Sequence, residues 1–209
     1  MTKIWGPMGW MTLHSISLNY PENPVYEDKI IVKRFLDKFA ECITCNSCKV
    51  HFQTMYQSYI RSHPDWANSR FDLFLFIARA HNTVNKRLDK PLVRTVSDCL
   101  ETIKSNVRNT SLSQFRYTYI HHVIRNWAAM RSGEGMIFGN AAREMDKINN
   151  EYWNLRETDL STVSFPEADI TTSIEQQRPS LSVVIPGIPN IGSNIGFKMV
   201  RGRLSLGGR

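Results

Sequence analysis

The chain has 209 residues, of which 42% are hydrophobic and 22% charged, with a formal net charge of +7. These values are ordinary for a globular protein and exclude a fibre, a globally disordered chain and a membrane protein. No apolar segment of a secretory signal follows Met1, so we expect a cytoplasmic protein. The basic residues are spread over both halves of the chain, and we therefore do not expect a nucleic-acid-binding protein.

Helical periodicity runs through most of the sequence, and strand alternation is absent from the first half. Apolar residues at helical spacing predict five helices at 7–20, 26–41, from the cysteines to residue 62, 70–88 and 95–106. Pro7 suits a first helical position. Two more helices are predicted at 112–131 and 140–157, separated by a Gly-containing segment at 132–135.

The composition changes after about residue 160, and residues 178–209 contain five Lys or Arg and no Asp or Glu. Such a segment is typical of an extended tail. We therefore predict an all-α protein with three parts. They are a four-helix bundle plus a short fifth helix over residues 1–105, a helical extension over 106–160, and an extended, basic, Gly- and Pro-containing tail over 161–209.

Three of the four cysteines follow one another at a spacing of three: Cys42, Cys45 and Cys48. A CxxC pair at a helix start can form a reversible disulfide, because residues i and i+3 share one turn and the helix N-terminus favours a thiolate. With His51, the same three cysteines could instead hold zinc or an iron–sulfur cluster. They could also be buried free thiols in the core. The spacing alone leaves all three interpretations open.

Two further segments carry unusual residues. Trp10 and His14 are four residues apart on one predicted helix face, in the segment that ends at Tyr20-Pro21. The second segment places His81, Val84, Asn85 and Leu88 on one helical stripe. Imidazole and amide groups on an apolar stripe need polar partners. A planar ligand rich in heteroatoms would supply them, and cations at the end of this helix could meet phosphate.

Together these segments resemble the Erv/ALR family of sulfhydryl oxidases. That family carries WG-x3-W-x3-H-x5-YP, a CxxC at a helix start and HN-x-VN-x2-L-x-K(P), in this order, and the resemblance covers about residues 1–95. Its viral members resemble F-x5-C-x2-C-x2-H, which this chain fits with Phe39, Cys45, Cys48 and His51.

The resemblance implies an FAD-dependent thiol oxidase that makes disulfides in proteins and passes electrons to O2, giving H2O2. Cys45 would be attacked by the substrate, and Cys48 would face the flavin. No resident metal is implied. The residues implied to surround FAD are Trp10, His14, Tyr20, His51, His81, Asn82, Val84, Asn85, Lys86, Leu88 and Lys90.

The resemblance also implies partners and a location. The family usually forms homodimers through its first helices. Many members have a second CxxC in a mobile tail; here we expect electrons from a separate thiol carrier or directly from protein substrates, unless Cys42 acts as a relay. The family's structural cysteine before the HN motif is replaced by Ala78. The chain is similar to the short forms of large cytoplasmic DNA viruses, which implies host cytoplasm and virion, with residues 106–209 available to contact capsid or virion proteins.

Two alternatives from other classes stay open on the sequence. The first is a non-enzymatic interaction protein stabilised by zinc or an iron–sulfur cluster at Cys42, Cys45, Cys48 and His51. The second is a basic virion structural protein.

Overall fold

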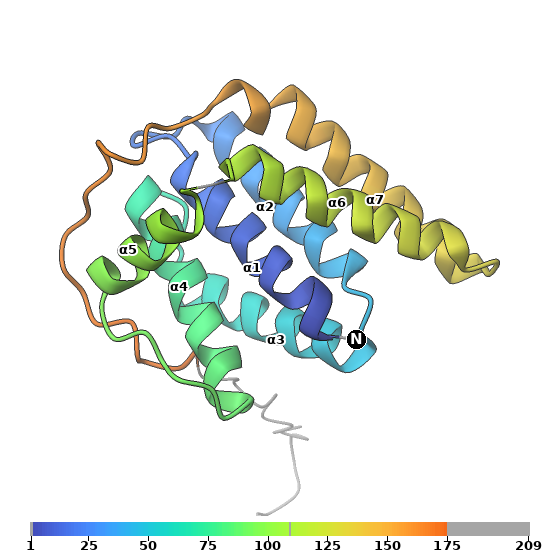
Figure 1. Ribbon diagram of the computed structural model, residues 1–209, viewed down its shortest axis with the longest axis horizontal. Helices are drawn as coiled ribbons and strands as arrows, with labels where there is room; N and C mark the ends of the chain where they lie inside the picture. The colour runs from blue at the N-terminus through green and yellow to red at the C-terminus, as the bar shows by residue number, and fades with distance from the viewer. Residues whose placement is uncertain (1, 109, 175–209) are drawn as a thin grey trace, which may run out of the picture. The chain divides into compact units, whose positions relative to one another are not determined.

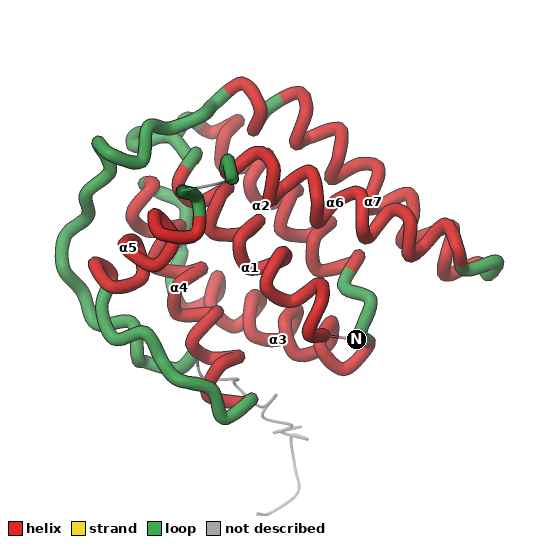
Figure 2. The backbone as a smooth tube through the Cα atoms, in the orientation of Figure 1, coloured by secondary structure: helices red, strands yellow, loops and turns green. Residues whose placement is uncertain are grey.

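The computed structural model describes residues 2–108 and 110–174, and these are mainly helical (Figures 1 and 2). The helices within these ranges are α1 (Thr2–Leu18), α2 (Tyr26–Cys42), α3 (Asn46–Ser62), α4 (Arg70–Arg87), α5 (Val96–Asn106), α6 (Leu112–Ala129), α7 (Gly133–Glu151) and the 3-10 turn η1 (Trp153–Leu155). The described residues contain no β-strand, and Thr95 and Asp169 form an isolated antiparallel bridge. The predicted all-α fold class is confirmed.

Serine and threonine side chains mark the starts of four helices. Each accepts a hydrogen bond from the backbone N–H three residues further on, which satisfies one of the free donors of the first turn. These caps are Ser69, Thr95, Ser111 and Ser132. At α2 the cap is reversed, because the Asp28 carboxylate accepts from the Val25 N–H at 2.9 Å.

Two predicted boundaries are wrong. α1 begins at Thr2, so Pro7 lies inside the helix, where its ring nitrogen cannot donate a hydrogen bond. α7 begins at Gly133 instead of residue 140. The Ser132 hydroxyl accepts from the Gly135 N–H, and a Cβ on Gly135 would overlap the backbone oxygen of Met130. The glycines therefore permit a tight turn between two helices, where composition had predicted a longer loop.

α6 and α7 form a helical hairpin on the bundle. α6 packs against α1, and α7 packs against α2 (Figure 1). The buried side chain of Arg116 links the layers, because its guanidinium donates to the Ser15 hydroxyl on α1 and to the Asn149 side chain on α7. The extension therefore covers α1 and α2 within the same chain.

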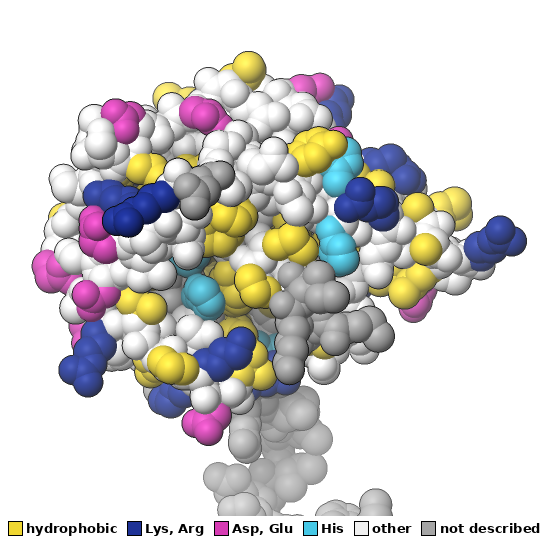
Figure 3. All heavy atoms as spheres, viewed as in Figure 1, with side chains coloured by type: hydrophobic (Ala, Val, Ile, Leu, Met, Phe, Trp, Pro, Cys, Tyr) yellow, Lys and Arg dark blue, Asp and Glu magenta, His cyan; other side chains and the backbone are white. Residues whose placement is uncertain are grey.

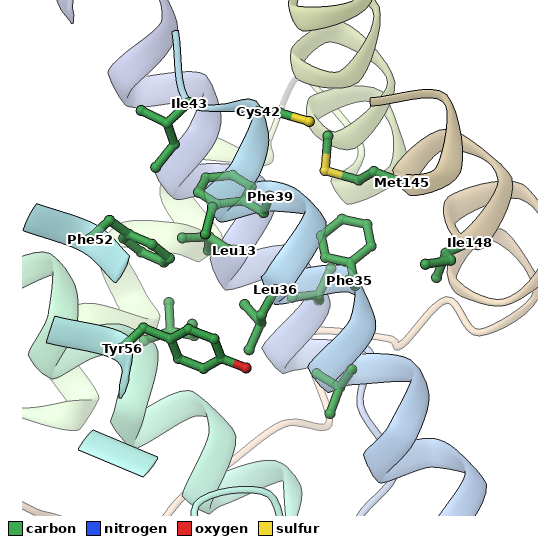
Figure 4. Packing of buried hydrophobic residues seen from close by; sticks show 14 of the residues in the cluster. Leu13, Phe35, Leu36, Phe39, Cys42, Ile43, Phe52, Tyr56, Met145 and Ile148 are labelled. Atoms are coloured by element: carbon green, nitrogen blue, oxygen red, sulfur yellow. The ribbon is translucent and has the colours of Figure 1, made fainter. Parts of the chain in front are cut away.

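Aromatic residues of α2 form the centre of the main hydrophobic core (Figure 4). Phe35 packs edge-on to Trp153, and Phe39 stacks on Tyr119 of α6 with ring centroids 5.0 Å apart. Every residue from Thr12 to Tyr20 is buried. The position of α1 between α4 and α6 explains this burial.

A second, smaller core lies around α4 and α5 and includes the segment after η1. Phe165 packs on Phe71 and Phe74, and Ile170 is fully buried. The first part of the predicted tail, residues 161–174, thus packs on these helices, whereas residues 175–209 lie outside the described residues. Among the described residues, no helix is long and apolar enough to cross a membrane.

Candidate redox and cofactor site

The cysteine pair lies where α3 begins. Cys45 is the N-cap residue of α3 and forms a disulfide with Cys48, with Cα atoms 5.2 Å apart. The Cys48 N–H points to Cys45 Sγ at 3.3 Å, and the Ser47 hydroxyl lies 3.4 Å from the same sulfur. When the disulfide is reduced, these donors and the helix N-terminus would favour a thiolate on Cys45. The predicted choice of Cys45 and Cys48 as the disulfide pair is confirmed.

The other two cysteines lie in apolar surroundings. Cys42 donates from Sγ to the Phe138 backbone oxygen at 3.5 Å, and burial raises the pKa of its thiol to about 12. Burial likewise raises the pKa of the Cys99 thiol to about 12. Within the described ranges, no group of three or more His, Cys, Asp or Glu side chains is arranged to hold a metal ion. The structure therefore gives the alternative metal site no support.

An aromatic and imidazole cluster continues from the disulfide. Phe52 lies one turn after Cys48 on α3, and its ring centroid is 6.3 Å from that of Trp10. Trp10 in turn stacks on His81 at 4.3 Å, with the ring planes 8° apart. His14 completes the cluster, with Nε2 3.2 Å from Nδ1 of His81. The structure thus brings together the Trp/His motif of α1, the CxxC of α3 and the His motif of α4.

Both imidazoles of this cluster are kept neutral. Burial lowers the pKa of His81 to about 4, with a further contribution from the Lys90 cation. Burial and the proximity of His81 lower the pKa of His14 well below its ordinary value. His14 Nδ1 has no hydrogen-bond partner among the described residues. A buried unpaired ring nitrogen is costly unless a ligand satisfies it.

The other predicted cofactor residues lie in three different settings. Val84 and Asn85 are half-buried and Leu88 is 53% exposed, so this stripe of α4 is open beside His81; Lys86 and Lys90, at the end of α4 and just after it, are exposed. His51 is half-buried, and burial together with the cation of Arg87 lowers its pKa. Two of the predicted residues are already satisfied by backbone groups. Tyr20 donates to the Ala67 oxygen, and Asn82 donates to the oxygens of Val93 and Ile170.

Comparison with known proteins shows the family to which the chain belongs. The model of the Erv1 / Alr family matches residues 7–108. An African swine fever virus protein named FAD-linked sulfhydryl oxidase is 30% identical over 89 residues, which are 43% of this chain and 71% of that protein. The chain belongs to the Erv1/Alr family.

Two further relatives show how much of each protein is shared. The Saccharomyces cerevisiae mitochondrial FAD-linked sulfhydryl oxidase ERV1 is 37% identical over 86 residues, 41% of this chain and 43% of the yeast protein. The Acanthamoeba polyphaga mimivirus probable FAD-linked sulfhydryl oxidase R368 is 26% identical over 119 residues, 56% of this chain and 80% of that protein. This chain therefore matches less than half of the yeast protein. The crystal structure of the yeast Erv1 core aligns with a TM-score of 0.39 at 33% identity, covering 44% of this chain and 75% of that chain.

The Erv1/Alr match ends before α6, yet α6 and α7 contact residues on both sides of the Cys45–Cys48 disulfide. Trp127 Nε1 donates to the Cys42 backbone oxygen at 3.0 Å. The ammonium group of Lys49, the residue after Cys48, lies 3.3 Å from the ring centroid of Phe138 and 5.3 Å from that of Trp127. Such cation–π contacts stabilise a desolvated cation.

The sequence analysis missed these contributions and that of Phe52. The Phe52 contact could have been inferred, because Phe52 follows Cys48 by four residues on a predicted helix. Trp127 and Phe138 had no such signal, because nothing local specifies that α6 and α7 fold back onto α2 and α3.

Proposed function

We propose that this chain is an FAD-dependent sulfhydryl oxidase that forms disulfides in other proteins and passes the electrons to O2, giving H2O2. One observation carries the proposal: the Cys45–Cys48 disulfide at the start of α3 continues through Phe52 into the cluster of Trp10, His14 and His81. Cys48 and Phe52 thus share one face of α3, and this face lies against Trp10, whose ring belongs to the cluster with the neutral imidazoles of His14 and His81. The names of the relatives support the same activity.

The residues fit a flavin. A bound flavin would give the unpaired Nδ1 of buried His14 a hydrogen-bond partner. It would also cover the open stripe of α4, with apolar contacts to Val84 and Leu88 and a polar contact to Asn85. We propose that Trp10, His14, His51, His81, Val84, Asn85 and Leu88 surround the ring system, while Lys86 and Lys90 serve its phosphates or adenosine. Tyr20 and Asn82 are proposed as positioning residues, because their polar groups are bonded to backbone. When bound, FAD supplies two-electron acceptor chemistry and reoxidation by O2.

The chain's own chemistry is thiol–disulfide exchange. A substrate thiolate attacks Cys45 Sγ, the Cys45–Cys48 bond breaks, and Cys48 leaves as a thiolate. A second substrate thiolate then attacks the substrate sulfur of the mixed disulfide and releases Cys45, so two thiols have become one disulfide. The N–H of Cys48 and the Ser47 hydroxyl stabilise the negative charge that appears on Cys45.

We propose different roles for the two helical parts of the chain. Residues 1–105 would carry the oxidase chemistry, and residues 106–160 would be a helical extension that covers α1 and α2. Protein thiols or a separate thiol carrier would be the electron source, with O2 as the acceptor. The buried Cys42, with its raised pKa, is poorly suited to act as a relay.

We propose a homodimer that forms through the first helices, over the part of their surface that α6 and α7 leave uncovered. α6 and α7 cover parts of α1 and α2, and an apolar strip of α2 and its N-cap stays open, with Val25, Tyr26 and Ile30 at 59%, 73% and 48% exposure. We expect light scattering to show a dimer that Ile30→Glu converts to a monomer. A monomeric wild-type protein at micromolar concentration would exclude the dimer.

The viral relatives support a further proposal on location. We propose that the chain acts in the cytoplasm of an infected host cell and enters the virion, with residues 106–209 in contact with virion proteins. Quantitative mass spectrometry of purified particles and of the cytoplasmic fraction tests this. Absence of the chain from the particles would exclude the virion part.

The deciding experiment for the activity is an absorbance spectrum of the purified protein, together with oxygen uptake on dithiothreitol. We expect a flavin band near ~450 nm and oxygen uptake that Cys48→Ser abolishes. Cys42→Ala is the matched control, because Cys42 is the buried cysteine three residues from Cys45. A colourless protein after refolding with excess FAD, or one that carries stoichiometric zinc, would refute the proposal.

A further inference from the structure

The end of the α6–α7 hairpin exposes large apolar side chains. Met130, Met136 and Ile137 are 45%, 64% and 60% exposed. This end projects beyond the connection between α2 and α3 (Figure 1), and hydrophobic and basic side chains gather over it (Figure 3). Exposed apolar patches of this kind mark interaction sites when they form a continuous surface.

A shallow groove makes this surface continuous. Its volume is about 400 Å³, and its larger side chains belong to Trp127, Met130, Arg131, Met136 and Arg143. The residues that line the groove include two arginines and no carboxylate. The groove therefore offers an apolar floor, and its rim carries Arg131 and Arg143 against one neighbouring carboxylate, the exposed Glu134, so its net positive charge complements an apolar segment that carries negative charge.

The groove is connected to the redox disulfide through Trp127. One side of this residue lines the groove, while its indole N–H donates to the backbone of Cys42 and its ring lies near the ammonium group of Lys49. Cys42 is the last residue of α2, and Lys49 directly follows Cys48. Trp127 therefore connects the groove to the segment from Cys42 to Lys49, which contains the Cys45–Cys48 disulfide.

Resting on the sulfhydryl oxidase activity proposed above, we infer that this groove docks the protein substrate, through an acidic, apolar segment near the cysteines to be oxidised. The positive charges of Arg131 and Arg143 favour an acidic substrate segment in the groove over a second copy of the chain. A two-fold contact through the same surface would bring Arg131 and Arg143 of both copies together, and like charges disfavour such a contact. The groove would thus select substrates before exchange at Cys45.

Oxygen uptake on three thiol probes tests this inference. The probes are dithiothreitol and two synthetic peptides, each with two cysteines, flanked in one by Glu and Leu and in the other by Lys and Leu. We expect kcat/KM to be about tenfold higher for the acidic peptide than for the basic peptide. Arg131→Glu combined with Arg143→Glu should remove this preference and leave dithiothreitol oxidation unchanged. Arg61→Glu is the matched control, because exposed Arg61 lies at the opposite end of α3 from Cys45.

The apolar part of the surface is tested separately. Met136→Ser combined with Ile137→Ser should lower kcat/KM for the acidic peptide about fivefold or more, mainly through KM. Leu155→Ser is the control, since Leu155 is 74% exposed and lies beyond the far end of α7. Circular dichroism of each variant establishes that it is folded.

The outcomes separate the two proposals. A wild-type protein that does not oxidise dithiothreitol refutes the proposed activity itself. A wild-type protein that oxidises dithiothreitol but shows no preference between the peptides refutes the docking groove alone. The groove is also refuted if the arginine variant behaves like Arg61→Glu, or if light scattering shows a dimer that Ile137→Ser dissociates.

Discussion

Replacing Arg116 by Met tests whether α6 and α7 form one folded unit with α1 to α5. The Arg116 side chain is fully buried, and burial lowers its pKa to about 10. Its guanidinium donates to the Ser15 hydroxyl at 2.5 Å, to Asn149 Oδ1 at 2.8 Å and to acceptors in the segment around η1. Methionine has a similar length and no polar group, so the substitution removes these links with little change in volume.

The expected loss can be bounded from these contacts. Each hydrogen bond to a charged donor contributes about 1.5–3 kcal/mol, and the substitution leaves several buried acceptors unpaired. The cost of burying a cation whose hydrogen-bond partners are neutral offsets much of this sum, and the carboxylate of Glu157 recovers only part of that cost. We therefore expect the free energy of unfolding to fall by about 2–4 kcal/mol. At about 2–4 °C per kcal/mol for a chain of this size, Tm should fall by roughly 5–15 °C.

Thermal unfolding followed by circular dichroism, with oxygen uptake on dithiothreitol at each temperature, measures this. Because Ser15 adjoins His14, we expect helicity and activity to be lost in one transition at the lowered Tm. Arg125→Met is the control, since Arg125 is exposed on the same helix and its change should stay within about 0.5 kcal/mol. A loss below about 1 kcal/mol would refute the reasoning. Two transitions, with only the first one moved, would show that α6 and α7 unfold separately.

Three other substitutions probe single features. Gly135→Ala should destabilise the protein by about 2 kcal/mol or more, because its Cβ would meet backbone oxygens at the end of α6, whereas Gly133→Ala, with open space around it, should be neutral by thermal unfolding. Cys42→Ala should keep oxygen uptake within about twofold of wild type, because its buried thiol takes no part in exchange; a loss above tenfold would make Cys42 a redox residue. Because the pKa of His81 is lowered in the folded protein, the unfolded state binds a proton below pH ~6.5 that the folded state does not bind. The free energy of unfolding should therefore decrease as the pH falls from ~6.5 to about 4. His81→Gln should flatten this slope in urea unfolding by up to about 1.4 kcal/mol per pH unit.

Local signals were sufficient for most of the fold and for the centre of the site. Periodic apolar residues define α2 to α5 within a few residues, because each of these helices buries one face in the core. Spacing also predicted that Trp10 and His14 share one face of α1 and that His81 belongs to a single stripe of α4, whereas the meeting of these faces with the CxxC was implied by the resemblance to the Erv/ALR family. The placement of residues on one face depends only on spacing along that helix, which the sequence specifies directly.

Contacts between distant segments could not be predicted in the same way. Nothing near Lys49 indicates that its ammonium group will lie over Phe138, which is 89 positions later in the chain. The start of α7 was missed for a related reason, because Gly133 and Gly135 predict a loop by composition. Here the close approach of the α6 backbone makes a glycine necessary at position 135 inside a helix.

The α6–α7 hairpin also makes two cysteine pairs chemically different, although their spacing in the sequence is the same. Cys42 and Cys45 are three residues apart, as are Cys45 and Cys48, so both pairs could form by sequence alone. α2 ends at Cys42, and the hairpin covers it there, with Phe138 accepting its S–H and Trp127 bonded to its carbonyl oxygen. This cover keeps the Cys42 thiol protonated, and only a thiolate attacks a disulfide. We therefore expect little exchange of the Cys45–Cys48 bond with Cys42, while Cys45, at the helix start, would react with thiols from outside.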